Sequence, residues 1–267
     1  RPGLKARADI LAIHLKRLTK TDELKIGDLA RSGAGMSGAD LANWVNEAAI
    51  EAARRKDPAV TMEHFALAKD RVLIGPRNFG IELSEDEERA VAYHEAGHAV
   101  VRVTLGGSVD RVTIVPHGSA LGVTFTTPEE SNRFTKESLA TELAVLMGGR
   151  AAEEIFTGTV SSGASSDIER ASRMAFEGCA ILGLGDGVAF APQTDSGRAA
   201  AEELARDLVR QAYDRAKTII LDKREAAAAL ADLLVREKTV AVAGTALEGA
   251  IRRGSNDSKE RNHDEAR

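Results

Sequence analysis

The residues best suited to chemistry in this 267-residue chain form the stretch His94-Glu95-Ala96-Gly97-His98. If the stretch is helical, His94 and His98 lie one turn apart and both imidazoles project from the same face. Two nitrogen ligands placed in this way can share one zinc ion. Glu95 follows the first histidine, so its carboxylate could take a proton from a water that the metal has made acidic. The pattern therefore predicts a zinc site that hydrolyses peptide bonds.

A pattern of three fixed residues with two free positions also arises by chance. In that case the histidines are ordinary core residues whose ring nitrogens have hydrogen-bond partners. The two residues between the histidines, Ala96 and Gly97, favour the metal site, because small side chains allow another segment of chain to approach the ion closely.

A helix is well supported around this motif. Ser84 and Glu87 have the spacing of a capping box, and four acidic residues in succession favour a helix N-terminus. Apolar residues then recur at helical spacing until Gly106 and Gly107 end the pattern. The motif is therefore expected in the second half of a buried helix.

A third ligand must come from elsewhere in the chain, because a catalytic zinc ion generally takes three protein ligands. Spacing leaves Glu153, Glu154 and Asp167 as candidates, and the residue types do not choose among them. Ser166 and Glu169 have the spacing of a second capping box, so Asp167 is expected in the first turn of a helix. The helix dipole keeps an aspartate ionised there, which suits a metal ligand and an ordinary helix start equally.

The rest of the pattern predicts a mainly α chain with a small β-sheet. Residues 1–73 are expected to form a helical bundle, 74–83 a linker, 84–253 the domain with the zinc site, and 254–267 a disordered tail. Within the second domain, 109–115 and 122–127 predict an antiparallel pair of strands, and 196–235 one or two long helices. Gly148 and Gly149 interrupt a helical pattern, which favours close packing against another backbone.

Composition limits the partners and the compartment. The net charge is −5, with acidic and basic residues interspersed, so nucleic acid is not an expected partner. Cys179 is the single cysteine, which excludes an intramolecular disulfide and fits a reducing compartment. No apolar run approaches the ~20 residues of a membrane span. We therefore expect the chain itself to be soluble, with any membrane anchor outside it.

Several blocks beyond the zinc motif occur in one order across about residues 1–175, and several blocks in register are more specific than one motif. Together they resemble the FtsH-type ATP-dependent zinc proteases, the membrane-anchored AAA+ proteases of bacteria and of organelles descended from them. The blocks are Ser37-Gly38-Ala39-Asp40-Leu41-Ala42-Asn43, Ala68-Lys69-Asp70-Arg71-Val72, His94-Glu95-Ala96-Gly97-His98, Ala120-Leu121-Gly122-Val123-Thr124, Gly148-Gly149-Arg150-Ala151-Ala152-Glu153-Glu154 and Gly163-Ala164-Ser165-Ser166-Asp167-Ile168-Glu169-Arg170-Ala171.

The resemblance implies a role for each matching block. Residues 1–73 would be the helical lid of an AAA+ ATPase module, with Gly38 and Ala39 near the nucleotide, and the following domain would be the peptidase. The third zinc ligand would be Asp167 and the general base Glu95. An unfolded polypeptide substrate would add as a strand beside Gly122-Val123-Thr124-Phe125, a mode that reads backbone more than side chains.

The same resemblance implies a homo-hexamer whose ATPase ring feeds unfolded or damaged proteins to enclosed sites on the cytoplasmic face of a bacterial inner membrane. The sequence contains no Gly-x-x-x-x-Gly-Lys-Ser/Thr loop, so the N-terminal ATPase core is expected to be missing from it and ATP is expected only in the full-length protein. The resemblance implies that a membrane anchor is missing as well. The competing hypothesis is a zinc-stabilised pseudo-protease that serves as an assembly scaffold. Competent residues at every inferred catalytic position argue against it.

Overall fold

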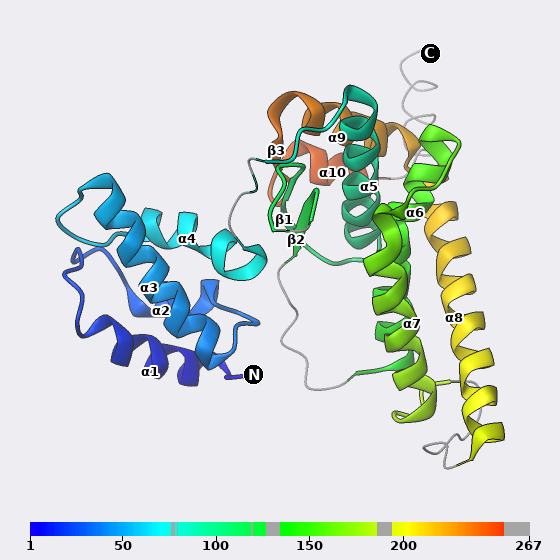
Figure 1. The fold of residues 1–267 in the computed structure, drawn as a ribbon, viewed down its shortest axis with the longest axis horizontal. Helices are drawn as coiled ribbons and strands as arrows, with labels where there is room; N and C mark the ends of the chain where they lie inside the picture. Colours follow the sequence, from blue (N-terminus) through cyan, green and yellow to red (C-terminus); the bar gives the residue numbers. More distant parts are fainter. Residues whose placement is uncertain (76–77, 79, 119, 127–133, 186–193, 254–267) are drawn as a thin grey trace, which may run out of the picture. The chain divides into compact units, whose positions relative to one another are not determined.

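A computed structural model of residues 1–267 describes the chain except for 76–77, 79, 119, 127–133, 186–193 and 254–267. The disordered tail predicted at 254–267 therefore lies outside the described residues. Contacts divide the chain into two compact units, one made mostly of Arg1–Ile81 and one made mostly of the residues from Glu82 onwards (Figure 1). The predicted mainly α fold with a small sheet is confirmed.

In its described residues, the first unit is a bundle of four helices around an aromatic centre. The rings of Trp44 and Phe65 meet edge to face at 5.0 Å, and the indole nitrogen of Trp44 donates to the carbonyl of Phe65 at 2.7 Å. Both side chains are almost completely buried, so they supply much of the apolar burial that stabilises this small bundle. The helices are α1 (Leu4–Leu15), α2 (Ile26–Ser32), α3 (Gly38–Arg55) and α4 (Met62–Ile74).

The second unit is built around one buried helix, α5, which packs against α6, α8 and α9 (Figure 1). The predicted capping box at its start is confirmed, since Ser84 and Glu87 bond to each other's backbone nitrogens. The helices of this unit are α5 (Glu85–Thr104), α6 (Lys136–Thr157), the short 3₁₀ turn η1 (Ser162–Ala164), α7 (Ser165–Ala180), α8 (Asp195–Asp222), α9 (Arg224–Glu237) and α10 (Ala246–Arg252). Along the described residues, none of the helices is long and apolar enough to cross a membrane.

A three-stranded antiparallel sheet in the order β2-β1-β3 lies beside these helices. The predicted pairing of β1 (Val109–Thr113) with β2 (Val123–Thr126) is confirmed, and β2 is an edge strand. The third strand, β3 (Thr239–Ala241), has no clear signal in the sequence, because three residues are too few to show an alternation.

The start of α7 differs from the prediction. The helix begins at Ser165 directly after η1, and its N-cap is Ala164, which makes no side-chain cap. The predicted capping box of Ser166 and Glu169 is therefore wrong, because the preceding 3₁₀ turn already places Ser166 inside the helix. Asp167 nevertheless lies in the first turn, as expected.

The helices α5 and α6 cross at a point where neither has a side chain. A Cβ added to Gly97 would lie 2.2 Å from the carbonyl oxygen of Gly148, and one added to Gly148 would lie 2.7 Å from the carbonyl oxygen of Gly97. Both distances are shorter than any real contact, so the two backbones touch. The predicted close packing at Gly148 is confirmed.

Replacing Gly97 with alanine should therefore force α5 and α6 apart. We expect Gly97→Ala to lower the free energy of unfolding by about 2–3 kcal/mol or more, as overpacking in a rigid core does. Gly249→Ala in α10 is the matched control, since its Cβ would meet only the guanidinium of Arg253, at 3.5 Å or more. Urea unfolding of both variants measures the difference. Equal midpoints would contradict the proposed backbone contact.

Candidate metal centre

Three side chains from two helices converge beside the middle of α5. His94 and His98 project from α5 and Asp167 projects from the first turn of α7. The Nε2 atoms of the two imidazoles lie 3.0 Å apart. The Oδ2 atom of Asp167 lies 3.2 Å from the first and 3.3 Å from the second. All three residues are buried, so the cluster is shielded from bulk water.

The spacing of these donor atoms fits a tetrahedral zinc ion. Ligands at about 2.0–2.1 Å from a tetrahedral metal are about 3.3 Å from one another, which follows from the geometry of the site alone. The three separations here match that value within a few tenths of an ångström. Two imidazoles and one carboxylate are also ligand types that zinc prefers.

Hydrogen bonds behind the rings decide which nitrogens face the metal. The Nδ1 atom of His98 lies 2.8 Å from the carbonyl oxygen of Val145, which can only accept, so this nitrogen carries the proton. The Nδ1 atom of His94 lies 2.6 Å from the Oε1 atom of Glu153 and donates to it in the same way. Both Nε2 atoms are therefore left as lone-pair donors that point into the cluster.

Three lone-pair donors at this separation need a cation between them. Burial opposes a charged imidazole at His94, but hydrogen bonds to Asp167 and Glu153 outweigh it and raise the pKa of His94 to about 10. Burial would also raise the pKa of Asp167, yet the bonds from the two histidines lower it. At neutral pH the raised pKa of His94 means that its imidazole holds a proton when no metal is bound. A divalent cation would replace that proton.

The crossing of the two helices also makes room for the first ligand. A Cβ added to Gly149 would lie 2.5 Å from the Nε2 atom of His94, so the ring rests directly on the backbone of α6. Any side chain at this position would push the imidazole away from Asp167. The glycine pair of α6 therefore serves both the helix crossing and the placement of the His94 ring.

Glu95 lies beside the cluster and is not part of it. Its side chain is 6% exposed, and burial raises the pKa of its carboxyl. The hydroxyl of Thr124 on β2 donates to its Oε2 atom at 2.8 Å. A buried carboxylate of raised pKa next to a metal site is suited to accept a proton during a reaction.

The three acidic candidates for the third ligand occupy different places. Asp167 faces both Nε2 atoms, whereas Glu153 bonds to the back of the His94 ring and to the backbone nitrogen of Ser161. Glu154 points towards α8, where it accepts hydrogen bonds from the hydroxyl of Tyr213 and the ammonium of Lys217. Among the described residues, the geometry favours Asp167 as the third ligand.

The residues predicted to bind the substrate lie at β2, and those predicted near the nucleotide lie at the start of α3. Gly122 and the first three residues of β2, Val123, Thr124 and Phe125, form a half-buried edge of the sheet, and Thr124 brings this edge to Glu95. Gly38 and Ala39 begin α3 in the first unit, directly after its N-cap.

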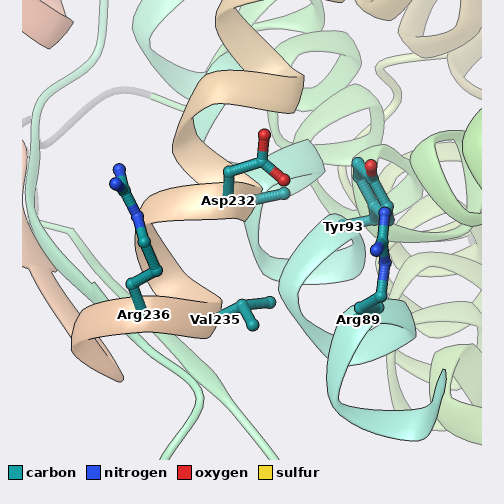
Figure 2. Close-up of a pocket in the computed structure, with 6 residues that line it drawn as sticks. Arg89, Tyr93, Asp232, Val235 and Arg236 are labelled. Atoms are coloured by element: carbon teal, nitrogen blue, oxygen red, sulfur yellow. The ribbon is translucent and has the colours of Figure 1, made fainter. Parts of the chain in front are cut away.

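A separate surface cavity of about 380 Å³ lies between α5 and α9. Figure 2 shows Arg89 and Tyr93 of α5 across from Asp232 and Val235 of α9, while the side chain of Arg236 extends away from α5. None of the residues that line this cavity belongs to the metal cluster or bonds to Glu95. The cavity is therefore distinct from the candidate metal centre.

Two features of the site have no signal in the sequence. The partner of His98 is a main-chain carbonyl, that of Val145, which no residue type marks. The hydrogen bond from Thr124 to Glu95 joins a strand to a helix 29 positions away. Neither residue type predicts that the two side chains will meet. The sequence does mark the partner of His94, because Glu153 is a candidate ligand there, but the structure gives it the role of supporting the ring.

A family model described as Peptidase family M41 matches residues 81–245, and one described as AAA+ lid domain matches residues 24–67. Proteins named ATP-dependent zinc metalloprotease FtsH are similar to the chain. The protein from Protochlamydia amoebophila is 39% identical over 90% of the chain and 29% of its own length, and that from Acidobacterium capsulatum is 47% identical over 66% and 28%. The protein from Magnetococcus marinus is 37% identical over 90% of the chain and 39% of its own length, so the chain spans about a third of these curated relatives.

The adjacent glutamates of α6 offer a matched test of the site. Glu153→Gln should lower zinc affinity about 10- to 100-fold, because the support of a ligating histidine is weakened. Glu154→Gln changes the next residue in the same way but removes only contacts to Tyr213 and Lys217, so its zinc affinity should stay within about twofold. Competition with a chromophoric chelator measures both affinities. A larger loss in Glu154→Gln would contradict the assigned roles.

Proposed function

The chain belongs to peptidase family M41, and we propose that it acts as the zinc endopeptidase part of a longer ATP-dependent protease. The membership confirms the resemblance found in the sequence. The observation that carries the proposal is the convergence of His94, His98 and Asp167 on one point, with the buried carboxylate of Glu95 beside it. The names of the relatives support zinc as the metal.

The residues of the site divide the work of peptide hydrolysis. His94, His98 and Asp167 would hold Zn²⁺, which supplies a Lewis acid that polarises the scissile carbonyl and makes water more acidic. Glu95 takes a proton from the attacking water onto its carboxylate and passes it to the nitrogen of the leaving amine. Glu153 and the carbonyl of Val145 keep both imidazoles in the tautomer that directs Nε2 inwards.

The substrate is proposed to be an unfolded polypeptide that pairs with Gly122-Val123-Thr124-Phe125 as an added strand. This segment borders the edge of the sheet, where the strand's outer hydrogen-bonding groups face away from β1. Strand addition uses main-chain groups that every peptide has, so selectivity for sequence would be low. Such a mode suits the removal of unfolded or damaged membrane and cytosolic proteins.

The first unit is proposed to be the lid of an ATPase module. The match of residues 24–67 to the AAA+ lid supports this role for residues 1–73, with Gly38 and Ala39 at the nucleotide, 74–83 as the linker and 84–253 as the peptidase domain. By analogy with the relatives, ATP would be hydrolysed by the longer protein, which we propose to work as a homo-hexamer on the cytoplasmic face of a bacterial inner membrane.

The proposal is tested by a substitution that spares the metal ligands. Glu95→Gln removes the proton acceptor but keeps the shape of the side chain, so cleavage of unfolded casein should fall at least about 100-fold. Zinc content, measured by atomic absorption, should remain one ion per chain. Glu85→Gln, at the exposed start of the same helix, is the control and should retain wild-type cleavage.

Two other outcomes would change the conclusion. If neither the wild type nor Glu95→Gln cleaves casein while both contain full zinc, the assembly scaffold is favoured over the enzyme. Full cleavage by Glu95→Gln would mean that another group accepts the proton.

A further inference from the structure

The carboxylate of Glu95 contacts the segment from Gly122 to Thr124, at the start of the edge strand β2. The hydroxyl of Thr124 lies 2.8 Å from the Oε2 atom of Glu95 and 3.1 Å from its backbone carbonyl oxygen. Among the described residues, no other group donates a hydrogen bond to this carboxylate. A single hydroxyl therefore orients a buried side chain that has three rotatable bonds.

Gly122 contacts the same carboxylate two positions earlier. A Cβ added to Gly122 would lie 2.6 Å from the Cγ atom of Glu95 and 2.8 Å from its Oε1 atom. Residues two apart along an extended chain project to the same side, so Gly122 and Thr124 face Glu95 together. Gly122 leaves space for the side chain of Glu95, and Thr124 donates a hydrogen bond to its Oε2 atom.

This arrangement distinguishes the two oxygens of the carboxylate. Oε2 accepts the hydrogen bond from Thr124, whereas Oε1 lies against the bare backbone of Gly122 and accepts none from a described residue. Oε1 is therefore the oxygen with full capacity to accept a proton. Rotation of the side chain would exchange the two oxygens, and the hydroxyl of Thr124 opposes that rotation.

We propose that Thr124 and Gly122 are positioning residues that fix Glu95 with Oε1 ready to accept the proton. The inference rests on the proposed function, in which Glu95 is the general base and the same segment pairs with the substrate. The segment from Gly122 to Thr124 would then align both the substrate peptide and Glu95. The distance between the peptide and the carboxylate would therefore be set by one extended segment of backbone. Misplacement of a catalytic group by about 1 Å costs on the order of 100-fold in rate.

The test compares variants of the zinc-loaded protein on a short fluorogenic peptide. Thr124→Val replaces the hydroxyl with a methyl group and should lower kcat about 10- to 100-fold, with KM within about twofold and zinc content unchanged. Thr124→Ser restores a hydroxyl and should recover most of kcat. Gly122→Ala should lower kcat in the same manner, because its methyl group displaces the Glu95 side chain.

Thr104→Val is the matched control. It makes the same replacement on α5, at a hydroxyl that is buried without a hydrogen-bond partner in the described part of the chain. Removing such a group leaves nothing unsatisfied, so kcat, KM and zinc content should remain at their wild-type values.

A second readout does not depend on catalysis. Thr124→Val should lower the urea midpoint of the wild type, but should lower it much less in a Glu95→Ala background, where the carboxylate partner is already gone. Equal shifts in both backgrounds, or a Thr124→Val variant with wild-type kcat, would overturn the proposal. Loss of zinc from Thr124→Val would overturn it too, since the residue would then support the metal site as a whole. If the wild type fails to cleave the peptide, the proposed function fails, while the urea comparison still tests the contact.

Discussion

Two imidazole nitrogens and a carboxylate oxygen lie 3.0–3.3 Å apart, and lone pairs this close together need a cation among them, either a proton or a metal ion. The protein could also separate these lone pairs by turning either ring. It does not, because Glu153 and the carbonyl of Val145 hold the opposite nitrogens. The donor atoms are therefore kept directed at one point, and in many metal-binding proteins such a site couples folding to metal binding.

The helix crossing makes these supporting bonds possible. Both groups that hold the imidazoles belong to α6, and they reach α5 because Gly97 and Gly148 let the two backbones touch. The bare backbone at Gly149 then lets the ring of His94 lie against the helix. The helix crossing and the placement of the His94 ring thus both depend on the absence of side chains at Gly97, Gly148 and Gly149.

The sequence predicted the parts of the site that depend on local spacing. Helical periodicity placed His94 and His98 on one face of a capped helix, and the glycine pair of α6 predicted a close crossing. Spacing could not select Asp167, which is 73 positions from His94, and only the family resemblance pointed to it. Ser166 misled the capping prediction because a preceding 3₁₀ turn leaves no trace in the residue types. Contacts to main-chain atoms, such as that of His98, leave no trace either.

The proposal on which the other assignments depend is that one zinc ion binds to His94, His98 and Asp167. It is tested most directly by a crystal structure of the zinc-loaded protein with anomalous differences measured on both sides of the zinc absorption edge. We predict a single peak above the edge, within about 2.0–2.2 Å of both Nε2 atoms and of an oxygen of Asp167. A peak bound instead by Glu153 or Glu154, or no peak between the two imidazoles, would contradict it.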